Sequence, residues 1–337
     1  MRLIVPMGGR GTRLRPFSHT TPKALLPLVG ATVVERIVRA VRAAVPRPLG
    51  EVVFVLNPAD ALGDVPERLR AACGREGLAV SVAVQDAPLG TAHAVGCAGD
   101  KLDGEVVTVW SDTLFSSARP APLGPAGGAG PDLVAWTVEV DDPARFGVAV
   151  RDEAGRVVRL VEKPQTPVSR ETLIGVYYVR DGAALREQIG GMVARGETGA
   201  GGEYQLTDAL DALVRGGAEM ATEPAATWLD AGTLGAYRET VRAVLDAEGT
   251  TDEGEAHDAV VIGPSYVGPG AVLRRSVVGP YAVVEGGATV EDAVVARSVV
   301  FAGARVASAV LDGALVGPRA RLAGAPSAAV LGDDGQA

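Results

Sequence analysis

The feature of this 337-residue chain that most restricts its fold is a six-residue repeat near the C-terminus. Aliphatic residues recur six positions apart in groups of three, and the groups recur every 16 or 17 residues. One inward aliphatic side chain per short face is typical of a parallel β-helix, whereas strands of an ordinary β-sandwich alternate with a period of two. The repeat positions are Val261, Val267, Leu273, Val278, Val284, Val290, Val294, Val300, Val306, Val310, Val316 and Leu322.

Upstream of the repeat, short aliphatic runs alternate with amphipathic stretches. The helical pattern of 33–45 lies between two expected strands, which is the order of a parallel or mostly parallel sheet. We therefore expect an α/β fold with a mixed, mostly parallel, Rossmann-like sheet. Expected strands are 3–5, 52–56, 80–84, 106–110, 133–140, 148–150, 157–162 and 174–179, and the Gly- and Pro-rich stretch 116–131 is expected to be a flexible excursion.

These patterns predict four segments. The first domain spans 1–245, an acidic linker without periodicity spans 246–258, a β-helix of about four coils spans 259–325, and 326–337 form a tail. The β-helix is expected to pack between subunits of a homo-oligomer, because its stacked coils leave a flank to cover.

Composition excludes several classes of protein. The net charge of −9 argues against a general nucleic-acid-binding surface. Two cysteines cannot build a disulfide framework or a metal cluster, which fits a reducing cytoplasm. No apolar run approaches the roughly 18–20 residues of a membrane helix, and the N-terminus does not read as a signal peptide. We expect a cytoplasmic protein with no membrane and no nucleic-acid partner.

A glycine-rich loop, Gly8-Gly9-Arg10-Gly11-Thr12-Arg13, follows the first expected strand. Glycines let backbone N–H groups approach a polyphosphate, and Arg13 adds a forked cation. Lys23 lies on a proline-bounded turn from which its ammonium could reach a phosphate. The dinucleotide fingerprint would need a third glycine where Leu14 stands, and the P-loop would need Gly-Lys-Ser/Thr, so neither motif is present. A tight turn with solvated arginines remains the alternative.

Residues 8–28, GGRGTRLRPFSHTTPKALLPL, resemble the signature of the sugar-1-phosphate nucleotidyltransferases, also called nucleotide-sugar pyrophosphorylases. Further family landmarks follow in order over 1–245. The chain departs from the family pattern at Met7, at Ser111 and in the Gly- and Pro-rich segment after Asp112. The landmarks are Gln85 with 89–94, Trp110-Ser111-Asp112, Phe146-Gly147-Val148, Glu162-Lys163-Pro164, Ile174-Gly175-Val176-Tyr177, 203–208 and 228–233.

The resemblance implies attack by a sugar 1-phosphate on the α-phosphorus of a nucleoside triphosphate, with Mg²⁺ as cofactor and pyrophosphate released. It implies Arg13, Lys23 and Asp112 as catalytic residues and Asp112 with Asp230 as metal ligands. Only three of the 32 basic residues are lysines, and Lys23 and Lys163 fall at motif positions. The implied nucleotide-binding residues are Gly8, Gly9, Gly11, Thr12, Gln85, Gly90 and Thr91, and the implied sugar-phosphate residues are Gly147, Glu162, Lys163 and Gly175.

The pairing of this domain with a short β-helix resembles the long type of glucose-1-phosphate thymidylyltransferases, whose β-helix is left-handed. It also resembles the bifunctional N-acetylglucosamine-1-phosphate uridylyltransferases, so dTTP and UTP both remain open. Relatives that use N-acetylglucosamine often carry Asn-Thr-Gly where this chain has Leu173-Ile174-Gly175, which favours glucose. The bifunctional enzymes need a longer β-helix that carries an acetyl-transfer histidine. The coils of this chain are expected to end near Leu322, and the nearby histidine, His257, is expected to precede the first coil, so we expect no acetyl-transfer activity. A non-catalytic nucleotide-sugar-binding regulatory subunit and a dehydrogenase also remain open.

Overall fold

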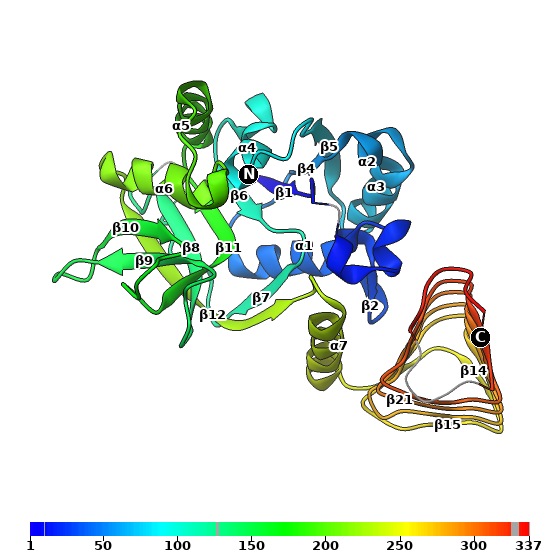
Figure 1. Ribbon diagram of the computed structural model, residues 1–337. Coiled ribbons are helices and arrows are strands. Elements are labelled where there is room, and N and C mark those ends of the chain that lie inside the picture. Colours follow the sequence, from blue (N-terminus) through cyan, green and yellow to red (C-terminus); the bar gives the residue numbers. More distant parts are fainter. Residues whose placement is uncertain (10, 126–127, 325–329, 337) are drawn as a thin grey trace. The chain divides into compact units, whose positions relative to one another are not determined.

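A computed structural model describes residues 1–9, 11–125, 128–324 and 330–336. The chain divides into two compact units (Figure 1). The sheet unit comprises Met1–Gly9 and Val34–Leu229, and the β-helix unit comprises Arg10–Val33 and Asp230–Ala337. Most of the glycine-rich signature therefore groups with the C-terminal part of the chain, whereas the sequence assigned all of 1–245 to one domain.

The sheet unit contains a ten-stranded sheet whose main path is β5-β4-β1-β6-β11-β8-β12-β7. Its first four strands are parallel: β5 (Ala79–Val84), β4 (Glu51–Leu56), β1 (Arg2–Pro6) and β6 (Val106–Val109). This order, in which the third and second strands lie on one side of the first and the fourth lies on the other, is that of a doubly wound fold. The chain therefore changes direction of winding between β1 and β6, and ligands of such sheets bind at the carboxyl ends of the strands there.

The second half of the sheet makes it mixed. Strand β11 (Glu171–Val179) runs antiparallel to β6 and to β8 (Leu133–Glu139), and β9 (Gly147–Arg151) pairs antiparallel with β10 (Val157–Glu162). Strand β12 (Met220–Asp230) returns parallel to β8, and β7 (Thr113–Ser117) follows it. The flexible excursion expected from Ser116 therefore begins with two residues of a strand.

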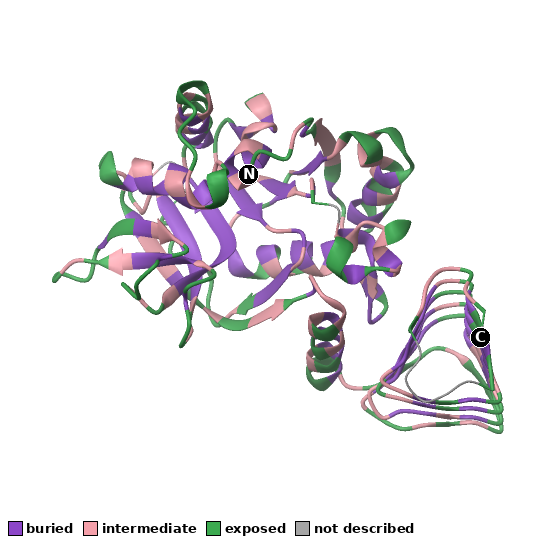
Figure 2. Cartoon of the chain, in the orientation of Figure 1, coloured by how far each residue is buried: buried purple, intermediate pink, exposed green. Residues whose placement is uncertain are grey.

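The first long helix of the chain buries the face that the sequence pattern assigned to it. In α1 (Val33–Ala44), Val34, Ile37, Val38 and Val41 are fully buried. On one sheet face, α4 (Thr91–Gly96), α5 (Gly182–Arg195) and α6 (Leu206–Arg215) share a core with Ile4, Val53 and Tyr177. Figure 2 shows the buried residues along the central strands. The other helices here are α2 (Pro58–Leu62), α3 (Val65–Arg75), η4 (Gly99–Leu102) and η5 (Ala200–Gly202).

The β-helix unit contains the parallel β-helix expected from the repeat. Three ladders of short parallel strands stack coil upon coil, with Val267, Val284, Val300 and Val316 inside. The ladders are β13 (Thr251–Asp252), β16 (Tyr266–Val267), β19 (Val283–Val284), β22 (Val299–Val300), β25 (Leu315–Val316), β27 (Val330–Leu331); β14 (Glu255–His257), β17 (Val272–Arg274), β20 (Thr289–Glu291), β23 (Arg305–Ala307), β26 (Arg321–Ala323); and β15 (Val260–Val261), β18 (Val277–Val278), β21 (Val294–Ala296), β24 (Val310–Asp312).

Two of the twelve repeat positions were assigned to the wrong residue. Val295 and Leu311 point into the β-helix, whereas Val294 and Val310 are exposed. Val284 lies six positions after Val278, but Val300 lies only five positions after Val295. The corner between the two strands is one residue shorter in the later coil. A constant period therefore selects the neighbouring valine.

The segment 246–258, predicted as an acidic linker without periodicity, contains regular structure. Helix α7 (Leu234–Glu248) reaches into it, and β13 and β14 form the first coil by pairing with β16 and β17. His257, which we expected to precede the first coil, therefore lies within it. The end coil needs no aliphatic side chains to pair its backbone, so no hydrophobic repeat marks it. Of the expected tail 326–337, residues 330–331 form β27, and 326–329 and 337 lie outside the described residues.

The N-terminal part of the β-helix unit is made of short turns: η1 (Thr12–Leu14), η2 (Phe17–His19), η3 (Lys23–Leu25) and the hairpin of β2 (Pro27–Leu28) and β3 (Ala31–Thr32). Among the described residues α7 is the longest helix, at 15 residues. None of the described helices combines the length and apolar character needed to cross a bilayer.

The corrected register predicts a contrast between two adjacent residues. Leu311→Ala should cost about 2–5 kcal/mol of unfolding free energy, because Leu311 is 0% exposed and its loss leaves a cavity. Val310→Ala, at a position 59% exposed, should stay within about 0.5 kcal/mol of the parent. Urea unfolding of the full chain measures both variants, and equal losses would contradict the register.

Candidate active site

Three predicted site segments of the sheet unit follow parallel strands. Gly8 follows β1, Gln85 follows β5 and Asp112 follows the end of β6 by three residues. In β1 and β6, Ile4 pairs with Thr108, so the loops that follow these strands leave from the same sheet edge. That edge lies at the change of winding direction, where doubly wound folds bind their ligands.

The Gln85 side chain is fixed in place beside Gly8. It is 6% exposed, and its Nε2 lies 3.3 Å from the carbonyl oxygen of Gly90 and 3.1 Å from Nδ1 of His93. A Cβ on Gly8 would stand 2.3 Å from Oε1 of Gln85. The first glycine of the loop is therefore needed for this contact, and His93 holds the Gln85 amide.

Gly90 and Thr91 connect this region to the start of α6. A Cβ on Gly90, where φ is +124°, would lie 2.5 Å from the carbonyl oxygen of Tyr204. The Thr91 hydroxyl accepts a hydrogen bond from the backbone N–H of Leu206 at 2.9 Å and donates one to Oε1 of Gln205 at 3.1 Å. Thr91, predicted to bind nucleotide, thus uses its side chain to hold the beginning of α6.

Gly175 lies against the indole of Trp110, because a Cβ on Gly175 would stand 1.9 Å from Cδ1 of Trp110. The Trp110 backbone N–H also donates to the Gly175 carbonyl at 3.2 Å. Trp110 lies two residues before Asp112, so Gly175 helps to place the turn that carries this carboxylate.

Glu162 is the centre of the predicted sugar-phosphate site. Its Oε2 accepts a hydrogen bond from Thr207 at 2.7 Å, and Nζ of Lys163, a residue whose side chain is 45% exposed, lies 3.5 Å from its Oε1. A Cβ on Gly147 would stand 3.0 Å from both partners of the Thr207–Glu162 bond. Burial and then the Glu162 carboxylate raise the pKa of Tyr177, which is buried nearby. Gly147, Glu162 and Lys163 therefore lie together.

Sequence reasoning flagged segment 203–208 but assigned no role to Thr207 or Asp208. Burial, followed by the Glu162 and Asp211 carboxylates, raises the pKa of Asp208. Asp211 is itself held by Nε of Arg159 at 2.9 Å and by the backbone N–H of Leu160 at 2.8 Å. These acids could not be placed beside Glu162 from sequence, because α6 and β10 meet only in the folded sheet unit.

The remaining signature residues belong to the β-helix unit. Gly11 adopts a left-handed conformation with φ +58°, and its carbonyl accepts hydrogen bonds from the Ser18 hydroxyl at 2.6 Å and the Leu14 N–H at 2.9 Å. This turn leaves Thr12 and Arg13 exposed to solvent and Lys23 half-buried. Arg13 is thus accessible to a ligand from solvent.

The β-helix and α7 hold this segment directly. Phe17 packs on Phe301 with ring centroids 5.1 Å apart, and Tyr237 of α7 stacks on Phe301 at 6.3 Å. The Tyr237 hydroxyl donates to the carbonyl of Pro27, the Gly30 N–H donates to Oε1 of Glu285 at 3.2 Å, and the Thr20 hydroxyl lies 2.6 Å from Oδ2 of Asp333. The β-helix therefore serves as a support for residues 11–33, a role beyond the subunit packing that was expected.

The two proposed metal ligands lie at strand ends. Asp230 ends β12, and its Oδ1 accepts the Gly232 N–H at 2.6 Å, while the turn carrying Asp112 is closed by a hydrogen bond from the Thr113 N–H to the Trp110 carbonyl at 3.1 Å. Within the described ranges, no three His, Cys, Asp or Glu residues gather into a metal cluster. A single carboxylate is a ligand type that Mg²⁺ takes, since this ion completes its shell with substrate phosphates and water.

Comparison with known proteins shows the family to which this chain belongs. The model of the nucleotidyl transferase family matches residues 3–247, and the chain belongs to this family. It is 30% identical to a glucose-1-phosphate thymidylyltransferase of Streptomyces griseus, over 82% of this chain and 80% of that protein, and 33% identical to one of Streptomyces antibioticus, over 82% and 75%. A crystal structure of UDP-glucose pyrophosphorylase with UDP-glucose has the same fold, with a TM-score of 0.58 and 19% identity over 73% of this chain and 99% of that chain.

The Trp110 contact predicts a difference between two glycines that share a backbone conformation. Gly175→Ala should cost more than about 2 kcal/mol of unfolding free energy and reduce turnover, because the methyl group meets the indole. Gly155→Ala is the matched control, since its φ is +78° and nothing lies within 4 Å of its Cβ position. It should cost only about 1 kcal/mol for the left-handed conformation. Thermal unfolding separates the two, and similar losses would contradict the contact.

The raised pKa of Asp208 predicts a pH-dependent stability difference. The fold disfavours the ionised carboxylate, so it loses stability as pH rises through the raised pKa, and Asp208→Asn escapes that loss. The variant should be more stable than the parent at pH 7, and the difference should shrink below about pH 4, where aspartate is protonated in both states. Urea midpoints at pH 7, 5 and 3.5 test this; a variant less stable at pH 7 than its parent would contradict it.

Proposed function

We propose that this chain transfers a nucleotidyl group from dTTP or UTP to a sugar 1-phosphate, with glucose 1-phosphate preferred, and releases pyrophosphate. The observation that carries the proposal is the common sheet edge of Gly8, Gln85 and Asp112 at the change of winding direction. The relatives named glucose-1-phosphate thymidylyltransferase support the choice of substrates.

In this reaction a phosphate oxygen of the sugar 1-phosphate attacks the α-phosphorus in line, and the bond from that phosphorus to the pyrophosphate oxygen breaks. No protein nucleophile is required, so catalysis consists of alignment and charge neutralisation. Arg13 steadies the β- and γ-phosphates and Lys23 faces the α-phosphate. Mg²⁺, when bound, neutralises phosphate charge and polarises the phosphoryl group, with Asp112 and Asp230 as its ligands.

The nucleotide base is assigned to Gln85. Its Nε2 is directed to the Gly90 carbonyl and to His93, which leaves Oε1 on the side of Gly8 and the phosphate loop. An amide oxygen accepts a hydrogen bond, and the N3–H group that thymine and uracil share is a matching donor. This contact favours either pyrimidine and does not separate them.

The sugar phosphate is assigned to Glu162 and Lys163. Thr207 orients the Glu162 carboxylate, whose acceptor oxygens suit sugar hydroxyls. Lys163 follows β10 with its ammonium half-exposed, where it can grip the phosphate. Neither Leu173 nor Ile174 offers an amide for an N-acetyl group, which favours glucose 1-phosphate.

An assay matrix tests the proposal as a whole. dTTP, UTP, ATP and GTP are each combined with glucose, N-acetylglucosamine or mannose 1-phosphate in the presence of Mg²⁺, and pyrophosphate is measured. We expect the fastest release with a pyrimidine nucleotide and glucose 1-phosphate. Preference for N-acetylglucosamine 1-phosphate would overturn the sugar assignment, and no release in any combination would favour a non-catalytic nucleotide-sugar-binding subunit.

The proposed role of Asp112 as a metal ligand predicts that removing its carboxylate lowers turnover. Asp112→Asn should lower kcat by about 100-fold or more, because a charge that stabilises the transferring phosphoryl group is lost, while circular dichroism stays unchanged. Asp100→Asn, on the exposed surface of η4, is the control and should keep turnover within about 2-fold. Normal turnover of Asp112→Asn would refute the metal role.

Substitution of two lysines distinguishes loss of a sugar-phosphate contact from loss of a positive charge elsewhere on the protein. Lys163→Ala should raise the KM for the sugar phosphate by about 10-fold or more, because a charge-assisted phosphate contact is lost. Lys101→Ala is the matched control, since its ammonium pairs with Glu51 at 2.8 Å, away from Glu162. Steady-state kinetics measures both, and unchanged KM and kcat in Lys163→Ala would count against its assignment.

A further inference from the structure

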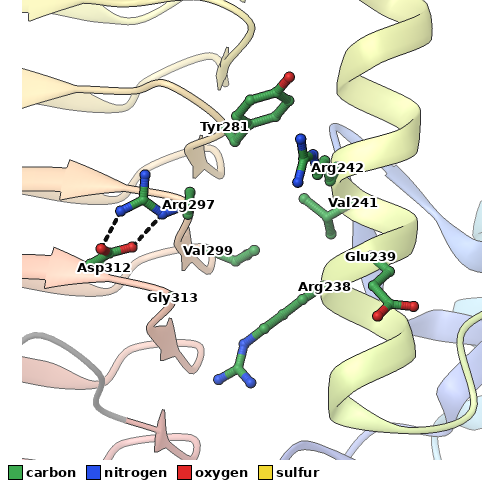
Figure 3. A pocket seen from close by; sticks show the side chains of 9 residues that line it. All are labelled: Arg238, Glu239, Val241, Arg242, Tyr281, Arg297, Val299, Asp312 and Gly313. Carbon is green, nitrogen blue, oxygen red and sulfur yellow. Dashed lines mark hydrogen bonds and ion pairs between the residues drawn. The ribbon is translucent and has the colours of Figure 1, made fainter.

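A cavity of about 250 Å³ lies between α7 and the β-helix (Figure 3). Arg238, Val241 and Arg242 face it from α7. Tyr281 and Val299 face it from the coils of the β-helix. None of the residues that line the cavity is among those assigned to the nucleotidyl transfer.

The three arginines of the cavity differ in their partners. Arg297 is neutralised by two hydrogen bonds to Asp312, one of them 2.6 Å from Nε to Oδ1. The Arg242 guanidinium lies 4.9 Å from the centre of the Tyr281 ring, and its Nε lies 4.0 Å from Oδ2 of Asp246, which also accepts a hydrogen bond from the Tyr281 hydroxyl at 2.7 Å. Nε of Arg238 is buried and has no hydrogen-bond partner among the residues that the structure describes. A buried donor left unpaired on a cation is costly, so this position favours an anionic acceptor.

We propose that this cavity binds a small phosphate ester. The buried Nε of Arg238 can donate to an oxygen of that phosphate, whereas the Arg242 guanidinium, one turn further along α7, points away from it toward Tyr281 (Figure 3). Val241, Val299 and the Tyr281 ring supply apolar surface for the carbon body of the ligand. A volume of about 250 Å³ accommodates a phosphate together with about one ring.

The walls of the cavity continue into the residues that hold the signature segment. Tyr237 precedes Arg238 on α7, and Phe301 follows the strand that carries Val299. Tyr237 and Phe301 stack on each other, and Phe301 packs on Phe17. A ligand that alters the spacing of α7 and β22 therefore changes the support of the loop that carries Arg13 and Lys23. This regulatory consequence rests on the proposed function, whereas binding does not.

Phenyl phosphate tests the site, because it combines a phosphate with one apolar ring and lacks a sugar to react. Calorimetric titration of the full chain should find a site that Arg238→Gln weakens by about 10-fold or more. Arg305→Gln, an exposed arginine on β23, should bind like the parent. Lys163→Ala should also retain the site, because Lys163 belongs to the sugar-phosphate site.

Three outcomes would overturn the binding site: no binding to the parent, equal binding to Arg238→Gln, or loss in Lys163→Ala instead. The regulatory consequence has its own measurement. Phenyl phosphate should change the KM for the nucleotide by at least about 3-fold in the parent and not in Arg238→Gln. Binding without a change in KM would overturn the regulatory consequence but not the binding site. A parent that is inactive in the absence of phenyl phosphate would instead overturn the proposed function.

Discussion

The packing of Phe17 between the turns of the signature segment and Phe301 of the β-helix is the contact on which this chain's organisation depends. It joins residues almost 300 positions apart and gives a glycine-rich, turn-forming segment a rigid support. Short 3-10 turns such as η1, η2 and η3 have few hydrogen bonds of their own, so their shape must come from what they pack against. In the proposed reaction, catalysis by alignment needs such a support, since Arg13 and Lys23 would act only where they are held.

Periodicity and motifs predicted a large part of the architecture. The six-residue repeat identified the β-helix, because each coil must bury one aliphatic side chain per face, and the apolar stripe of α1 was assigned to its buried face. A fixed period failed at Val294 and Val310, where the corner loses a residue, and in the first coil, where Ala256 pairs with the next coil without a buried aliphatic side chain. Neither the length of a corner nor the position of the first coil produces a periodic pattern in the sequence.

The candidate site was predictable as a set of segments and less so as a set of contacts. Motif spacing selected Gly8, Gln85 and Asp112, and the parallel order of the strands places their loops on one edge. The reason for each glycine came only from the fold: Gly8 accommodates Gln85 and Gly175 accommodates Trp110. Such reasons depend on which distant side chain fills the space, and a single sequence does not contain that information.

The first coil of the β-helix has a consequence for self-association. Strands β13, β14 and β15 each stand at the end of their ladder, which presents backbone donors and acceptors to any other strand. Four exposed acids lie on or beside these strands: Asp252, Glu253, Glu255 and Asp258. Two copies that met end to end would bring these like charges together, so the acids disfavour end-to-end stacking of one β-helix on another.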